Sequence, residues 1–150
     1  ALPNDAPGAS ALALYRYRLG APAGARLMLL SFDQNPADGV NDGSDGTVGV
    51  SSDGSYVYFV SSNQLVADRL PGAGPKIFVW HEGVIRQVGS INGGEELNRM
   101  TGGGAEGWQE GGRRARVSPD GEHLVFGTAG GGDLAGYDHG SGCPAGATTR

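Results

Sequence analysis

The amino-acid sequence predicts an all-β fold built from short antiparallel strands. Glycine occupies 29 of the 150 positions and proline another 8. Each glycine inside a helix costs about 1 kcal/mol relative to alanine, so long helices are disfavoured. The apolar and β-branched residues are gathered in short runs between clusters of turn-forming residues, as expected for strands. One strand–turn–strand segment, Val-Ser-x-Asp-Gly, occurs twice, at Val50–Gly54 and Val117–Gly121.

The first expected hairpin follows a short N-terminal stretch. Residues 1–11 are small and polar, which indicates a linker or loop. Leu12–Leu19 alternates tyrosine and leucine with arginine, the period expected for a strand with one buried face. Arg26–Phe32 is a second strand candidate, paired with the first across a turn at Gly20–Gly24. Residues 12–46 are therefore expected to form a partial unit of outer strands followed by an acidic loop.

The central part of the chain predicts consecutive strands joined by tight turns. Asp53–Gly54 suits a hairpin turn that needs positive φ, and Glu82–Gly83 forms a second such turn. Residues 47–91 are expected to form the core strands of one complete unit. The strands expected there are Thr47–Ser51, Tyr56–Ser61, Lys76–His81 and Val84–Val88.

The last third of the chain predicts one further hairpin. Residues 92–112 are glycine-rich and are expected to form a loop. Residues 113–128 contain the strands Arg114–Ser118 and His123–Thr128, which form a hairpin around Pro119–Gly121. Residues 129–150 show no strand pattern, and we expect a flexible tail at which the next unit is truncated.

The repeated segments predict how these units assemble. Val50–Phe59 aligns with Val117–Phe126, and the hairpin segments Leu14–Tyr17 and Ile77–Trp80 precede the two copies at similar positions. Each unit is therefore four antiparallel strands, which bury their faces by stacking on copies of themselves. Radial stacking of such sheets is a β-propeller. The prediction is a partial β-propeller of four-stranded blades, with about one complete blade and two partial ones.

The segment Val117–Phe126 (VSPDGEHLVF) resembles the first two strands of the TolB-like, or WD40-like, propeller repeat. Leu14–Arg18 and Ile77–His81 resemble its third strand, and the similarity extends to Gly136–Asp138. The resemblance implies an actinobacterial secreted propeller, located outside the cell, in the periplasm or in the cell envelope. It also implies a further strand after Asp138. We therefore expect a fragment whose edge strands pair with missing blades.

Structural roles are predicted for the Asp-Gly positions. The side chains of Asp53 and Asp120 are expected to bond the turn backbone, while Gly54 and Gly121 supply positive φ. These four residues are predicted to build turns rather than to perform chemistry.

The acidic loop is a candidate calcium site, because hard cations favour clustered oxygen ligands. The EF-hand spacing fails, since its twelfth position is Ser44 instead of glutamate. A solvated surface loop is the favoured interpretation, so no metal is predicted. The calcium candidates are Asp33, Asp38, Asp42 and Asp45.

No catalytic constellation can be assigned, so the protein is predicted not to be an enzyme. His81 and His123 flank turns. His139 and Cys143 are only two potential ligands, whereas a zinc site usually needs three or four. Gly102–Gly107 satisfies G-x-G-x-x-G but lacks the strand before it and the helix after it. No catalytic, metal or cofactor-binding residue is predicted.

Charge and hydropathy exclude two partner classes. The formal net charge is −5, and the one dense basic group, Arg113, Arg114 and Arg116, is not a basic face with interleaved aromatics. Nucleic-acid binding is therefore not predicted. No apolar run approaches the ~20 residues that cross a bilayer, so no membrane span is predicted.

The remaining partner classes are a protein or a glycan, bound by loops that rigid blades position. The loops expected to carry this function are Asp33–Gly46, Asn63–Pro75 and Asn92–Gly112. Trp108 in the last loop is a candidate contact residue, or alternatively covers the end of the core.

Two functions fit these observations. The first is a non-catalytic propeller module that binds a protein or ligand in an extracytoplasmic protein. The second is the accessory propeller of a prolyl-oligopeptidase-like hydrolase whose catalytic domain lies outside this chain. A G-x-S-x-G segment further along the gene would favour the second.

Overall fold

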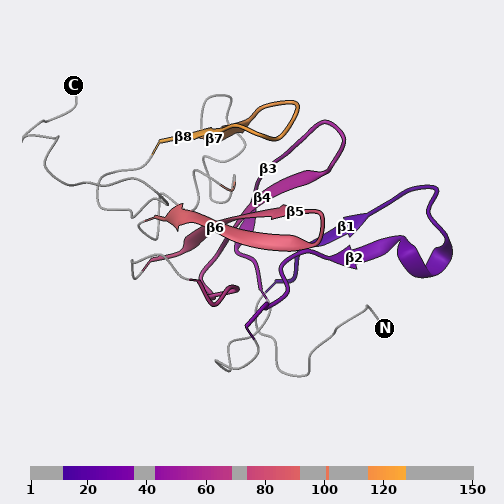
Figure 1. The fold of residues 1–150 in the computed structure, drawn as a ribbon, viewed down its shortest axis with the longest axis horizontal. Coiled ribbons are helices and arrows are strands. Elements are labelled where there is room, and N and C mark those ends of the chain that lie inside the picture. Colours follow the sequence, from indigo (N-terminus) through magenta and orange to yellow (C-terminus); the bar gives the residue numbers. More distant parts are fainter. Residues whose placement is uncertain (1–11, 36–42, 69–73, 92–100, 102–114, 128–150) are drawn as a thin grey trace, which may run out of the picture.

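The computed structural model describes residues 12–35, 43–68, 74–91, 101 and 115–127. In these residues it contains eight strands and one short 3-10 turn, arranged in three antiparallel sheets (Figure 1). The all-β prediction and the four-stranded antiparallel unit are therefore confirmed. The elements are β1 Tyr15–Tyr17, η1 Ala23–Ala25, β2 Leu27–Leu29, β3 Gly46–Val50, β4 Tyr56–Ser61, β5 Lys76–His81, β6 Val84–Ser90, β7 Ala115–Val117 and β8 Leu124–Phe126.

The central sheet is a meander in the order β3-β4-β5-β6. The bounds of β4 and β5 match the sequence prediction. Strand β6 extends two residues beyond the predicted end, to Ser90, because a bulge lets Ser90 pair with Lys76 after the register shifts. At the β5–β6 turn both Glu82 (φ 50°) and Gly83 (φ 85°) have positive φ, the backbone of a type I′ hairpin turn.

Both faces of the central sheet are buried. Successive side chains of a strand point to opposite faces. Val57 and Phe59 of β4 belong to one apolar cluster, while Tyr58 and Val60 belong to another on the opposite face. The phenyl rings of Phe59 and Phe78 stack with their centroids 5.6 Å apart. Burial on both sides explains why the sequence of β4 is an uninterrupted apolar run and does not alternate apolar with polar residues.

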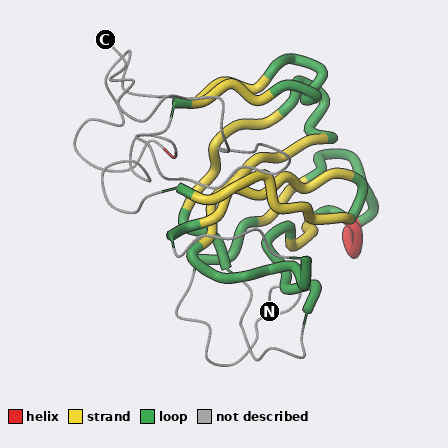
Figure 2. Tube along the Cα trace, turned by 60° about the vertical axis from the view of Figure 1, so that its left-hand side comes forward, coloured by secondary structure: helices red, strands yellow, loops and turns green. Residues whose placement is uncertain are grey.

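Each neighbouring hairpin covers one face of the central sheet, so the sheets form layers (Figure 2). On one side the chain around β1 and β2 contributes Leu14, Leu30 and Phe32. On the other side the β7–β8 hairpin contributes side chains such as Val117 and Phe126. This succession of a two-stranded, a four-stranded and a two-stranded sheet is consistent with the predicted partial β-propeller.

The β1–β2 hairpin differs from its prediction. Strand pairing is confined to Tyr15–Tyr17 and Leu27–Leu29. The buried face assigned to Tyr17 and Leu19 is wrong, because their exposed fractions are 58% and 88%. Arg16 turns toward the central sheet instead, where its guanidinium carbon lies 4.6 Å from the Trp80 ring centroid. The face of the Trp80 ring attracts the positively charged guanidinium. Arg16 therefore contacts the core, although arginine is usually exposed on the protein surface.

Gly121 and Gly54 are a matched pair for testing the contact between sheets. Both have positive φ, of 81° and 71°. A Cβ on Gly121 would lie 2.5 Å from the Tyr56 side chain, whereas a Cβ on Gly54 would meet nothing within 4 Å. Gly54→Ala should cost about 1–2 kcal/mol of backbone strain. Gly121→Ala should lower the free energy of unfolding by the same backbone strain and by a further ~1–3 kcal/mol, because the new methyl group overpacks against Tyr56. Urea unfolding measures both, and equal losses would contradict the stacking of β7–β8 on β4.

A second stability prediction concerns the type I′ turn. Asparagine tolerates positive φ better than glutamate does, and Asn-Gly is the preferred pair in such turns. Glu82→Asn should therefore raise the free energy of unfolding by about 0.5–1 kcal/mol, a fraction of the cost of left-handed backbone. Urea unfolding curves of the two proteins give the comparison. An unchanged or lower midpoint for the variant would argue against this turn geometry.

Candidate binding surface at the turns

The tight turns of successive sheets come together at one end of the molecule. Strand direction alternates along the meander, so the β3–β4 and β5–β6 turns lie at the same end of the central sheet. The β7–β8 turn joins them, because the Ser52 N–H donates to the Pro119 carbonyl over 2.8 Å. All three turns lie on the right in Figure 1. We call the segments 51–55, 82–83 and 118–121 together the turn surface.

The Asp53 carboxylate organises the β3–β4 turn. Its Oδ1 accepts hydrogen bonds from the Ser51 hydroxyl (2.8 Å), the Ser55 hydroxyl (2.7 Å) and the Ser55 N–H (2.9 Å). The Ser51 hydroxyl oxygen in turn accepts from the Tyr56 N–H over 2.9 Å. The bonds from Ser55, followed by the bond from Ser51, lower the pKa of Asp53 from 3.8 to about 2. Asp53 is therefore ionised at neutral pH.

The second Asp-Gly turn repeats this geometry. The Asp120 Oδ1 accepts from the Ser118 hydroxyl and from the Glu122 N–H, the latter at 3.0 Å. The Ser118 hydroxyl oxygen accepts from the His123 N–H over 3.0 Å. The bond from Ser118, followed by that from Glu122, lowers the pKa of Asp120. The serine of each Ser-x-Asp-Gly segment therefore bonds both the aspartate and the N–H that closes the turn.

His81 joins the β3–β4 and β5–β6 turns. Its ring stacks on Tyr56, with the centroids 3.8 Å apart and the planes inclined by 8°. Its Nδ1 lies 3.1 Å from the Ser55 carbonyl oxygen, and its Nε2 lies 3.9 Å from a carboxylate oxygen of Glu82. The imidazole therefore contributes to the structure of the turn surface.

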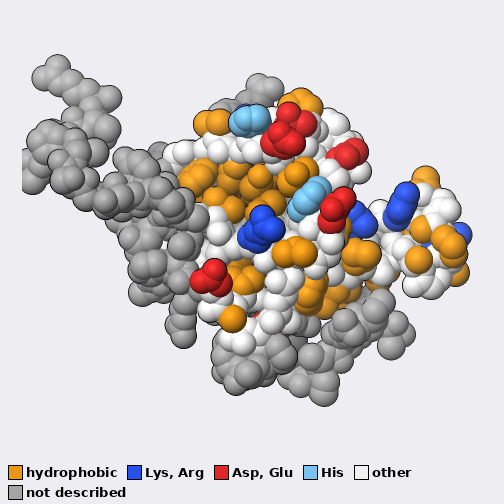
Figure 3. Space-filling view, in the orientation of Figure 1, with side chains coloured by type: hydrophobic (Ala, Val, Ile, Leu, Met, Phe, Trp, Pro, Cys, Tyr) orange, Lys and Arg blue, Asp and Glu red, His pale blue; other side chains and the backbone are white. Residues whose placement is uncertain are grey.

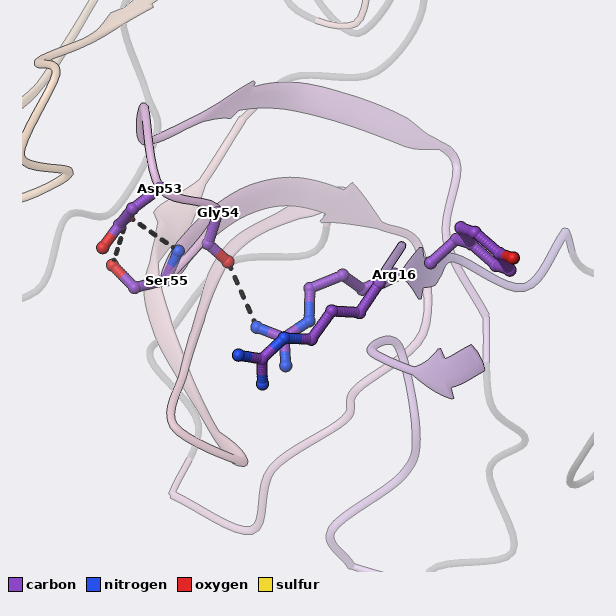
Figure 4. Close-up of a pocket in the computed structure, with 6 residues that line it drawn as sticks. Arg16, Asp53, Gly54 and Ser55 are labelled. Carbon is purple, nitrogen blue, oxygen red and sulfur yellow. Dashed lines mark hydrogen bonds between the residues drawn. The ribbon is translucent and has the colours of Figure 1, made fainter. Parts of the chain in front are cut away.

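A pocket of about 360 Å³ opens beside the β3–β4 turn (Figure 4). Arg16 reaches it from β1, and its Nη1 donates to the Gly54 carbonyl over 3.2 Å. Its Nη2 contacts the Met28 sulfur at 3.8 Å. We call this the arginine pocket. It is lined by Arg16, Tyr17, Arg18, Asp53, Gly54 and Ser55.

Another hollow, of about 300 Å³, lies on the face of the central sheet. Apolar side chains gather between the β7–β8 hairpin and β6 in Figure 3. The Tyr58 hydroxyl at its edge donates to the Gly121 carbonyl over 2.9 Å. Burial raises the pKa of Tyr58, and the neighbouring Tyr56 and Asp120 raise it further. The lining residues are Tyr56, Tyr58, Val79, His81, Glu82, Val84 and Arg86.

Two of the four calcium candidates lie in the described residues. The Asp45 Oδ2 accepts from the Ser62 hydroxyl over 2.6 Å, and the Asp33 Oδ1 accepts from the Asn35 N–H over 2.7 Å. Asp38 and Asp42 lie outside the described residues. In the described part of the chain, no three His, Cys, Asp or Glu side chains are grouped so that they could hold a metal ion. Calcium binding stays a prediction.

Several other candidates lie outside the described residues. Trp108, the G-x-G-x-x-G segment Gly102–Gly107, His139 and Cys143 are among them. Of the loops expected to bind a partner, the structure describes residues 33–35, 43–46, 63–68, 74–75 and 101. The participation of these loops in binding stays a prediction.

Sequence reasoning missed the role of Arg16. Alternation along 12–19 assigned this residue to the solvent side of the strand. Its contacts with Gly54 and Trp80 come from segments far away in the sequence. No local pattern signals such contacts, because they depend on how the hairpin sits on the neighbouring sheet.

The fold and the turn surface thus define an all-β protein of stacked antiparallel sheets. Searches of protein-family models, curated proteins and solved structures found no match to this chain. Among the described residues there is no helix with the length and apolar character needed to span a bilayer.

The lowered pKa of Asp53 predicts a stability loss in acid. The folded state keeps Asp53 ionised down to about pH 2, whereas the unfolded chain protonates it near its ordinary value of 3.8. The unfolded state therefore binds more protons in this window, and the free energy of unfolding should fall as the pH drops from about 5 to 2. Urea unfolding at stepped pH measures the slope.

Asp53→Asn should remove part of this slope, because the amide does not titrate. The control is Asp68→Asn, a change at an exposed carboxylate in the β4–β5 loop, outside the turn surface. It should leave the Asp53 contribution in place. An Asp53 carboxyl carbon that titrates near pH 4 by NMR would contradict the hydrogen-bond pattern.

Proposed function

We propose that this chain is a non-catalytic β-propeller module that binds a protein or glycan partner in an extracytoplasmic protein. The observation that carries the proposal is the linkage of turns from consecutive sheets. The bond from Ser52 to Pro119 joins two turns, and the bond from Arg16 to Gly54 ties a third segment to them. Turns fixed in this way form a pre-organised surface, which lowers the entropic cost of binding.

The chemistry of the turn surface supports binding over catalysis. Ser51 and Ser118 hydroxyls are committed to aspartates in the turns. A serine nucleophile needs a base positioned to take its proton. The His81 Nδ1 faces the backbone carbonyl of Ser55 and not a serine hydroxyl, so it is not placed to act as that base. The available features are the pocket beside the β3–β4 turn, the exposed Glu82 carboxylate and the exposed Tyr17 ring at the pocket, which suit recognition.

The extracytoplasmic location is proposed from the resemblance of the Val-Ser-x-Asp-Gly segments to the TolB-like repeat. The stacked sheets in the described residues are compatible with such a repeat. The partner then belongs to the cell surface or its surroundings, where glycans and proteins are both accessible.

The test uses the full-length product of the gene on arrays of cell-wall glycans and peptides. We expect binding that Glu82→Lys weakens at least tenfold, because the Glu82 side chain is 82% exposed on the turn surface. The comparison variant Asp68→Lys introduces the same charge change in the β4–β5 loop, which the sequence predicts as an alternative binding site. If the turn surface binds the partner, Asp68→Lys should leave binding intact. Both variants should keep the urea midpoint of the parent protein.

Three results would contradict the proposal. Absence of binding to every array would remove the binding function. Loss of binding in Asp68→Lys alone would place the partner on the β4–β5 loop. Labelling of a serine by a fluorophosphonate probe would favour the hydrolase accessory domain.

A further inference from the structure

The arginine pocket holds two positive charges close together. Arg16 lies in β1 and Arg18 directly follows the strand, and both side chains line the same pocket. In residues 12–35, 43–68, 74–91, 101 and 115–127 neither guanidinium forms an ion pair. Placing two like charges side by side is unfavourable unless an anion joins them.

One of the two arginines is held in place before any ligand arrives. The Arg16 guanidinium is fixed by the Gly54 carbonyl, the Met28 sulfur and the face of the Trp80 ring. These contacts use two of the five N–H donors that a guanidinium carries. The remaining donors are available to a carboxylate or a phosphate, both of which arginine binds in a bidentate manner. A fixed side chain loses little entropy when a ligand binds.

Asp53 narrows the class of ligand. Asp53 lines the same pocket, and its pKa of about 2 keeps it ionised. Its Oδ1 is bonded to Ser51 and Ser55, so the other carboxylate oxygen, Oδ2, is the acceptor that remains for a ligand. It repels a bare anion and can accept hydrogen bonds from a hydroxyl. A ligand that satisfies the whole pocket therefore needs an anionic group for the arginines and hydroxyl groups for Asp53. The volume of about 360 Å³ falls in the range of small-molecule sites.

We propose that the arginine pocket binds an anionic sugar, with Arg16 and Arg18 on its carboxylate or phosphate and Asp53 on its hydroxyl groups. The proposal rests on the binding function proposed above and specifies the chemical class of the ligand. A carboxylate and a phosphate share this recognition chemistry, and the experiment separates them.

The experiment is calorimetric titration of the whole chain with glucuronate, glucose 6-phosphate, glucose and inorganic phosphate. At least one of the two anionic sugars should bind ten times more tightly than glucose and inorganic phosphate do. The better of the two identifies the anionic group. Binding should weaken as salt rises, because exposed charges are screened.

Variants assign the binding to the pocket. Arg18 is exposed, so Arg18→Ala should keep the urea midpoint while lowering affinity about tenfold, and Arg18→Lys should restore part of it. Asp53→Asn should lower the preference for the anionic sugar over inorganic phosphate. The matched control is Arg86→Ala, which removes an exposed arginine from the hollow on the central sheet and should leave binding unchanged.

The proposal is overturned if glucose or inorganic phosphate binds as tightly as both anionic sugars do. It is also overturned if Arg18→Ala binds the anionic sugar with the affinity of the parent protein. Absence of binding overturns it as well. Array binding that Glu82→Lys abolishes would still stand in that case, so failure of the anionic-sugar site is distinguishable from failure of the binding function.

Discussion

The burial of both faces of the central sheet is the constraint on which the rest of the structure depends. Val57 and Phe59 on one face, and Tyr58 and Val60 on the other, all need to be removed from water. Burying such side chains contributes about 1.5–3 kcal/mol each, so one four-stranded sheet requires a neighbour on each side. The flanking hairpins supply this cover in the described residues, and stacked sheets are the result.

Stacking also explains the features of the turns. Tyr56 packs against Gly121, so a side chain at the second Asp-Gly turn would collide with the neighbouring sheet. The Tyr58 hydroxyl then reaches the Gly121 carbonyl. The same Ser-x-Asp-Gly segment therefore meets two environments. Gly54 lies in open space, with only its φ to satisfy, while Gly121 is constrained by φ and by close contact.

The electrostatics of the turn surface follow from the hydrogen bonds that the Oδ1 atoms of Asp53 and Asp120 accept within their own turns. Serine hydroxyls and backbone N–H groups hold Asp53 and Asp120 in their ionised forms. Arg16 meanwhile binds a backbone carbonyl and an aromatic ring instead of a carboxylate. Positive and negative groups thus line one pocket without pairing, which is the basis for proposing a ligand that carries both an anionic group and hydroxyls.

The sequence by itself determined the all-β class, the bounds of β4 and β5, and the Asp-Gly turns, because strand propensity and turn chemistry are local. It did not determine the exposure of Tyr17 or the extension of β6 to Ser90, since both depend on pairing and packing between segments. The arginine pocket was decided only by the tertiary structure. Arg16 meets Gly54 and Trp80 across sheets, and alternation along one strand carries no information about which neighbour covers it.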